Sequence, residues 1–225
     1  LMLVVIGGAE LFTGNNMFLT ISCLNKQACW SRLLYNWVIV YLANFVGSLL
    51  LVAIVFASAY YAKADGELTA VGVKALAIAK GKLTLTWSQA FFRGILCNWL
   101  VCMAVWLAMA AKDVVGKVFA IFFPIMAFVA SGYEHSVANM YFIPMGIKIA
   151  LANPSAAAAV ESLKLASPEA VTTLFTWGNF ISNNLIPVTL GNIVGGGLFV
   201  AAMYWFVYLR QSQLAPSVAS KNIKA

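Results

Sequence analysis

Charged residues are scarce in this sequence. Of its 225 residues, 9% are charged and 63% are hydrophobic, whereas about a quarter of the residues in an ordinary soluble domain carry a charge. A soluble chain of this length could not cover its surface with so few charged side chains. The composition therefore argues against a water-soluble globular protein and predicts a protein that lies within a membrane.

Histidine is scarcer still, since it occurs once, as His135. One histidine cannot supply bis-histidine haem ligation. The four cysteines (Cys23, Cys29, Cys97 and Cys102) have neither the spacing of a metal site nor that of a disulfide framework. The sequence also lacks a Ser-His-Asp arrangement, a phosphate-binding loop and a dinucleotide fingerprint. We therefore expect no enzymatic activity, no metal and no cofactor.

Acidic residues are half as numerous as basic ones, 7 against 14, which gives a net charge of +7. The basic residues are scattered between apolar segments and form no amphipathic stripe, which argues against nucleic acid as a partner. They are typical of juxtamembrane loops that contact lipid headgroups or attract anions. The positive-inside rule favours a cytoplasmic location for the short loops that hold Lys26 with Arg32 and Lys112 with Lys117.

Long apolar runs, in contrast, are abundant. A helix needs about 20 apolar residues to cross the hydrocarbon core, and three charge-free runs, 33–62, 94–111 and 185–209, are expected to do so as continuous helices. Tyrosine and tryptophan residues near their ends are typical interfacial anchors: Tyr35, Trp37, Tyr60, Tyr61, Trp205 and Tyr208. We predict a multi-pass protein of the cell (inner or plasma) membrane, surrounded by lipids.

Two further apolar runs, 1–24 and 118–149, are interrupted by polar residues at 7–16 and 131–139. Each interruption holds a glutamate five positions before an asparagine: Glu10 with Asn15, and Glu134 with Asn139. Paired interruptions in two halves of a chain predict a binding site built from discontinuous helices near the bilayer midplane. We expect each glutamate to accept N–H groups at the start of the following half-helix; a role as proton relay is the alternative.

His135 lies in the second interruption, beside Glu134. An ionisable group at membrane depth is costly and indicates a functional site. A group that can hold or lend a proton lowers the barrier for an anion in an apolar constriction, or protonates a weak-acid anion so that the neutral acid crosses. The alternative is a neutral histidine that only binds the backbone of the loop.

Three motifs resemble the formate/nitrite transporter family of anion channels: GAELFTGN at 8–15, ASGYEHSVANM at 130–140 and NNLIPVTLGNIVGGG at 183–197. The resemblance covers nearly the whole chain. It implies an all-α membrane protein with an aquaporin-like helical bundle and two broken helices, assembled as a homopentamer with one pore in each protomer. Of the family's six spans we expect five here, without the first, in a single channel domain over 1–210 that precedes a polar tail over 211–225.

The resemblance also implies the residues of the pore. These are a central histidine with a facing threonine, two hydrophobic constrictions, a vestibule lysine and two asparagines; the matching positions are His135 with Thr20, Phe128, Phe18 with Leu19 near it, Lys82, Asn98 and Asn192.

The substrate implied is a small monovalent anion of a weak acid. The segment at 143–147 and the linker at 150–176 are more similar to the formate branch, so formate is the leading candidate, and nitrite and hydrosulfide are the alternatives. A membrane subunit of a redox enzyme is the alternative from another class, although it would need more histidines or a carboxylate cluster. A purely structural protein and a neutral-solute pore are further alternatives.

Overall fold

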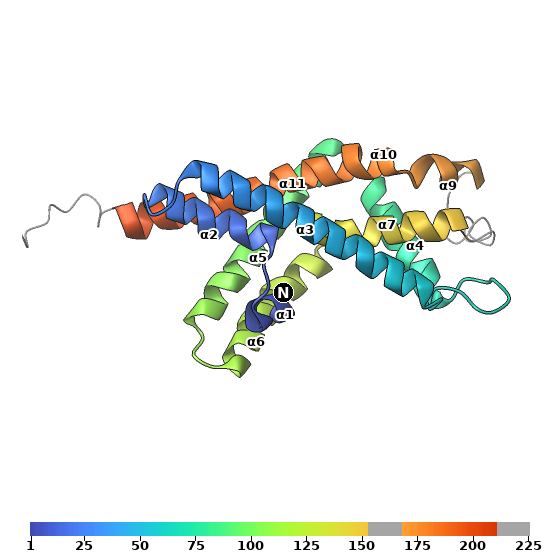
Figure 1. The fold of residues 1–225 in the computed structure, drawn as a ribbon, viewed down its shortest axis with the longest axis horizontal. Coiled ribbons are helices and arrows are strands. Elements are labelled where there is room, and N and C mark those ends of the chain that lie inside the picture. The colour runs from blue at the N-terminus through green and yellow to red at the C-terminus, as the bar shows by residue number, and fades with distance from the viewer. Residues whose placement is uncertain (153–167, 211–225) are drawn as a thin grey trace, which may run out of the picture.

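The computed structural model describes residues 1–152 and 168–210 and is built of helices (Figure 1). In chain order these are α1 (Met2–Gly7), α2 (Phe12–Leu24), α3 (Trp30–Ala57), α4 (Ala70–Leu83), α5 (Trp87–Ala110), α6 (Val114–Ala130), α7 (Ser136–Ala152), α9 (Pro168–Leu174), α10 (Trp177–Asn179), η2 (Phe180–Leu185), α11 (Ile186–Ile193), η3 (Val194–Ala202) and η4 (Trp205–Leu209). The predicted polar tail over 211–225 lies outside the described residues.

Three stretches are long and apolar enough to cross a membrane: α3, α5 and the C-terminal stretch Ala170–Leu209. The three predicted continuous spans are therefore confirmed. Helix α5 begins earlier than predicted because a polar cap, not the first apolar residue, sets its start. The Thr86 hydroxyl accepts the Gln89 N–H and the Gln89 side chain accepts the Thr86 N–H, which satisfies two of the unpaired donors at a helix start.

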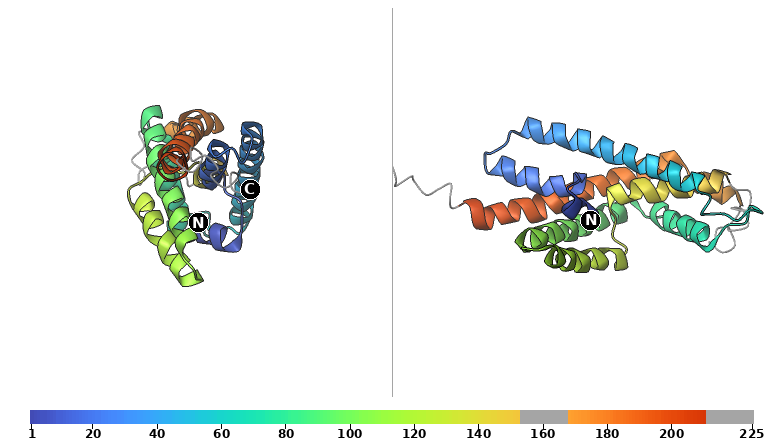
Figure 2. Two further views of the ribbon diagram at one scale, coloured as in Figure 1. Left: turned by 90° about the vertical axis from the view of Figure 1, so that its left-hand side faces the viewer. Right: turned by 60° about the horizontal axis from the view of Figure 1, so that its bottom comes forward.

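The long helices define one axis of the molecule. Helix α3 has 28 residues, so it is about 42 Å long and matches a bilayer with its headgroups. It runs along the longest axis together with the C-terminal helices (Figure 1). Viewed along that axis, α5 and α6 lie on the opposite side of the molecule from α3 (Figure 2).

Two helices are broken, as the interruptions predict. Residues 8–11 separate α1 from α2, and residues 131–135 separate α6 from α7. Each break contains a glycine with positive φ, Gly8 at 75° and Gly132 at 67°, a conformation that glycine reaches without a steric penalty. The breaks are shorter than the predicted interruptions because Phe12 and Ser136 already begin the next helix.

Glycines bring α5 close to the C-terminal helices. A Cβ atom at Gly191 or Gly195 would overlap the backbone oxygen of Phe91 or Ile95 on α5. Small residues allow this approach between membrane helices. Gly191 and Gly195 are therefore packing residues between α5 and the C-terminal helices.

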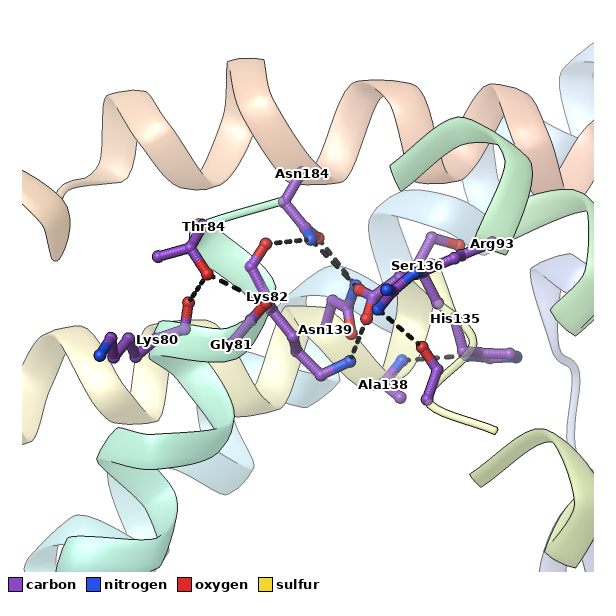
Figure 3. A network of polar contacts seen from close by, with 12 residues as sticks. Lys80, Gly81, Lys82, Thr84, Arg93, His135, Ser136, Ala138, Asn139 and Asn184 are labelled. Carbon is purple, nitrogen blue, oxygen red and sulfur yellow. Dashed lines mark hydrogen bonds and ion pairs between the residues drawn. The ribbon is translucent and has the colours of Figure 1, made fainter. Parts of the chain in front are cut away.

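Helix α4 carries a candidate site residue into the bundle. Its Leu76 and Ala79 are buried against Met140 and Ile143 of α7, so one face of this helix belongs to the core. Lys82 lies in its last turn, where it points toward the second break (Figure 3).

Candidate functional site

His135 ends the second break and is buried, with 8% of its surface exposed. Its Nδ1 accepts the backbone N–H of Ala138 (3.1 Å) in the first turn of α7. In the neutral ring the proton therefore lies on Nε2, which is 2.9 Å from the Thr13 hydroxyl. The imidazole thus joins the start of α7 to the start of α2 and connects the two broken helices.

The threonine that faces His135 is Thr13, not the predicted Thr20. The two threonines are seven residues apart, which is nearly two helical turns, so both lie on one side of α2. Both are buried. Thr13 reaches the imidazole because it is the second residue of α2, next to the first break, whereas Thr20 lies two turns farther along the helix.

A cavity of about 250 Å³ adjoins the imidazole, and we call it the histidine cavity. Its lining is apolar apart from His135 and includes Val4, Leu11, Val101 and Phe128. The Phe128 ring stacks on the imidazole with centroids 6.2 Å apart.

The predicted second constriction at Phe18 and Leu19 is not in the histidine cavity. Phe18 is 39% exposed and lines a different cavity, and neither residue is part of the histidine cavity's lining. Leu11, directly before α2, lines the histidine cavity together with Phe128. Successive helical residues turn by about 100°, so residues 18 and 19 face away from the side of α2 that carries Thr13.

Lys82 forms an ion pair with Glu134. The Lys82 Nζ is 3.0 Å from Glu134 Oε1, and the two side chains are 15% and 4% exposed. The other carboxylate oxygen accepts the side-chain amides of Asn139 (2.6 Å) and Asn184 (3.2 Å). Asn184 also donates to the Lys82 backbone oxygen (3.1 Å). Figure 3 shows Lys82, Asn139 and Asn184 converging beside His135.

This network corrects the expected role of the glutamates. In the described part of the chain, neither carboxylate accepts a backbone N–H of the following half-helix. Glu134 binds three side chains instead, and Glu10 accepts the amide of Asn15 (2.5 Å). The five-residue spacing between glutamate and asparagine therefore reflects a direct side-chain contact in both breaks.

Asn98 and Asn192 tie helices together beside the cavity, and both are fully buried. The Asn98 amide donates to the backbone oxygens of Asn192 (2.6 Å) and Thr13 (3.1 Å). Asn192 accepts the Ser136 N–H (2.9 Å) and donates to the Glu134 backbone oxygen (3.0 Å). Neither asparagine belongs to the lining of the histidine cavity. Their hydrogen bonds hold the backbone at the starts of α2 and α7, next to Thr13 and His135.

The first break is held by the same set of bonds. Asn44 of α3 accepts the Phe12 N–H (3.0 Å) and donates to the Glu10 backbone oxygen (3.2 Å), as Asn192 does for the second break. Asn15 donates to Asn36 (2.8 Å), as Asn139 does to Asn184 (2.7 Å). Sequence reasoning missed Asn36, Asn44 and Asn184. A signal was present, because α3 and the C-terminal stretch each hold two asparagines eight residues apart: Asn36 with Asn44, and Asn184 with Asn192.

Metal ligands were not predicted, and the described residues contain no group of three or more His, Cys, Asp or Glu side chains that could hold a metal ion.

Comparison with known proteins gives concordant results. The family model for the formate/nitrite transporter matches residues 1–206. A probable formate transporter from Methanothermobacter thermautotrophicus is 47% identical over 221 residues, covering 94% of this chain and 72% of that protein. The formate channel FocA of Escherichia coli K12 is 42% identical over 213 residues, with the same coverage of both chains.

Two solved structures have the same fold. One is titled a pentameric formate channel with formate bound; it has a TM-score of 0.75 and 40% identity, and the match covers 93% of this chain and 79% of that one. The other, an FNT family ion channel, has a TM-score of 0.70 and 32% identity, with 91% and 71% covered. The predicted fold with two broken helices is confirmed.

Proposed function

This chain belongs to the formate/nitrite transporter family, and from that premise we propose that it is a multi-pass membrane channel for small monovalent anions of weak acids, with formate as its substrate. The names of its relatives support formate. The observation that carries the proposal is the hydrogen bond between His135 and Thr13 at an apolar cavity between the broken helices.

The chemistry of the histidine cavity suits a weak acid. Transfer of a bare anion into an apolar space is costly, and the side chains of Leu11, Val101 and Phe128 offer it no hydrogen bond. His135 and Thr13 can donate hydrogen bonds, and an imidazole is a group that can supply or accept a proton. A formate ion can therefore pass while it is hydrogen-bonded or after it has become formic acid.

The polar network beside the cavity supports this role. Glu134 and His135 are neighbours in the chain, so the Lys82 ammonium is connected to the pore histidine through a buried carboxylate. We assign Lys82 to the vestibule on this side of the cavity. Because its charge is compensated by Glu134, we expect Lys82 to hold the second break in place more than to attract anions from a distance.

We further propose a homopentamer, since a solved relative is pentameric, with each protomer carrying a complete histidine cavity. Residues 1–210 form one channel domain in this proposal. The protein resides in the inner or plasma membrane, with the turns that hold Lys26 and Lys112 on the cytoplasmic side.

The test is flux into proteoliposomes, comparing formate, nitrite, hydrosulfide and glycerol between about pH 5 and 8, where histidine titrates. We expect formate flux to exceed the others and to rise at low pH if the protonated acid crosses. Preference for nitrite or hydrosulfide would replace only the substrate. Glycerol flux without anion flux would indicate a neutral-solute pore, and cofactor absorbance in the purified protein would favour the redox-enzyme alternative.

A further inference from the structure

A second cavity adjoins the histidine cavity. It has a volume of about 470 Å³ and lies among α1, α2, α5 and α6. Leu1, Val4 and Leu11 line both cavities, so the two spaces are neighbours. We call this second space the α6 vestibule.

Helix α5 shows where the α6 vestibule lies relative to Lys82. The Glu134 N–H donates to the oxygen of Arg93 (3.3 Å), so the Lys82–Glu134 pair is level with the first turns of α5. Val101 lines the histidine cavity, and Ala108 lines the α6 vestibule. From residue 93 to residue 108 the helix rises about 22 Å. The histidine cavity therefore lies between the ion pair and the α6 vestibule.

Among the described residues that line the α6 vestibule, Lys117 is the only charged one. It lies in the first turns of α6 and is partly buried. Within residues 1–152 and 168–210 it has no ion pair with a carboxylate. The nearby Asp113 instead accepts the Gly116 N–H with its carboxylate (2.7 Å) as the cap of α6, and Glu10 is bound by Asn15.

We propose that Lys117 is the anion-attracting residue of the channel on the side opposite Lys82. This inference rests on the proposed function. An uncompensated ammonium in a cavity with apolar walls focuses the field and concentrates anions, which raises their rate of entry. Lys82 contributes less to this effect because Glu134 cancels its charge at 3.0 Å. The two lysines therefore differ in the described part of the chain: Lys82 is paired with Glu134, whereas Lys117 has no carboxylate partner.

The test compares formate flux through Lys117→Gln and wild-type channels at subsaturating formate and two ionic strengths. At about 0.01 M the Debye length is about 30 Å and at about 1 M it is about 3 Å. We expect Lys117→Gln to lower flux at least about threefold at low salt. We expect little difference at high salt, where the charge is screened. Lys117→Arg should restore the flux and its salt dependence because it restores the charge.

Lys112→Gln is the matched control, since Lys112 is exposed and lies outside the vestibule lining. It should behave as the wild type. Equal flux through Lys117→Gln and wild-type channels at low salt would overturn the inference, as would a loss that is the same at both ionic strengths or is not restored by arginine. Absence of wild-type flux would instead contradict the proposed function, so the two failures are distinguishable.

Discussion

The two helix breaks share their construction but differ in the side chains they present. A shift of 124 residues places Glu10 on Glu134 and Asn15 on Asn139, and the bonds made by these residues correspond. The same shift places Leu11 on His135 and Thr13 on Val137. The residues that hold the backbone are thus the same in both breaks, whereas those at the cavity differ. A repeated scaffold carries two complementary halves of one site.

The breaks also differ in charge. Glu134 is 3% exposed and pairs with Lys82. Glu10 is exposed and has no cationic partner in the described part of the chain. The Glu134 carboxylate therefore belongs to a buried charge pair, whereas the Glu10 carboxylate is bound by the Asn15 amide. Both glutamates occupy the same position in the motif.

The largest effect is expected from removing the charge that distinguishes the second break. Glu134→Gln would leave the Lys82 ammonium buried without a counter-charge and should cost about 3 kcal/mol of stability. The matched change Glu10→Gln should cost less than about 1 kcal/mol, since an amide oxygen can still accept from Asn15. Denaturation of the two variants in micelles, followed by circular dichroism, measures the difference; equal losses would contradict the assigned asymmetry.

A second variant makes the two breaks alike at the cavity. His135→Leu gives the second break the residue type that the first carries at position 11. We expect formate flux to fall about 100-fold, because a positioned proton-transfer group contributes at least that factor, and the oligomer to remain intact. Flux into proteoliposomes between about pH 5 and 8 tests this. Unchanged flux with unchanged pH dependence would remove His135 from the mechanism.

A smaller effect is expected at the threonine that the first break contributes. Thr13→Val removes the hydroxyl 2.9 Å from the imidazole with little change of volume, and the loss of one buried hydrogen bond should lower flux about tenfold. Thr20→Val is the control and should lower it less. Initial rates of formate uptake compare the two; a larger loss in Thr20→Val would restore the original assignment of the facing threonine.

Much of this architecture follows from local features of the sequence. The length of charge-free runs predicts the continuous spans, and the paired glutamate and asparagine positions predict the breaks. The partners across helices do not follow in the same way. Thr13 and Thr20 lie on the same side of α2. Only the three-dimensional structure shows which of them lies at the level of His135 along the helix axis, and it is Thr13.

Other site residues were missed for a related reason. Asn36, Asn44 and Asn184 lie in apolar spans far from either motif in sequence, and their role depends on which helix packs beside which break. The ion pair of Lys82 likewise joins residues 52 positions apart. These contacts are set by the register of packed helices, which apolar periodicity does not encode.

The proposed homopentamer, with a complete histidine cavity in each protomer, has a consequence for mixed assemblies. If no neighbouring copy completes the site, each protomer conducts anions independently. An inactive His135 variant then does not lower the flux through the protomers around it. When wild-type and variant chains are co-assembled in varying ratios, total flux should then decline in a straight line with the fraction of variant chains. In that proposal the functional unit is one subunit, and the assembly acts as a set of parallel conductors.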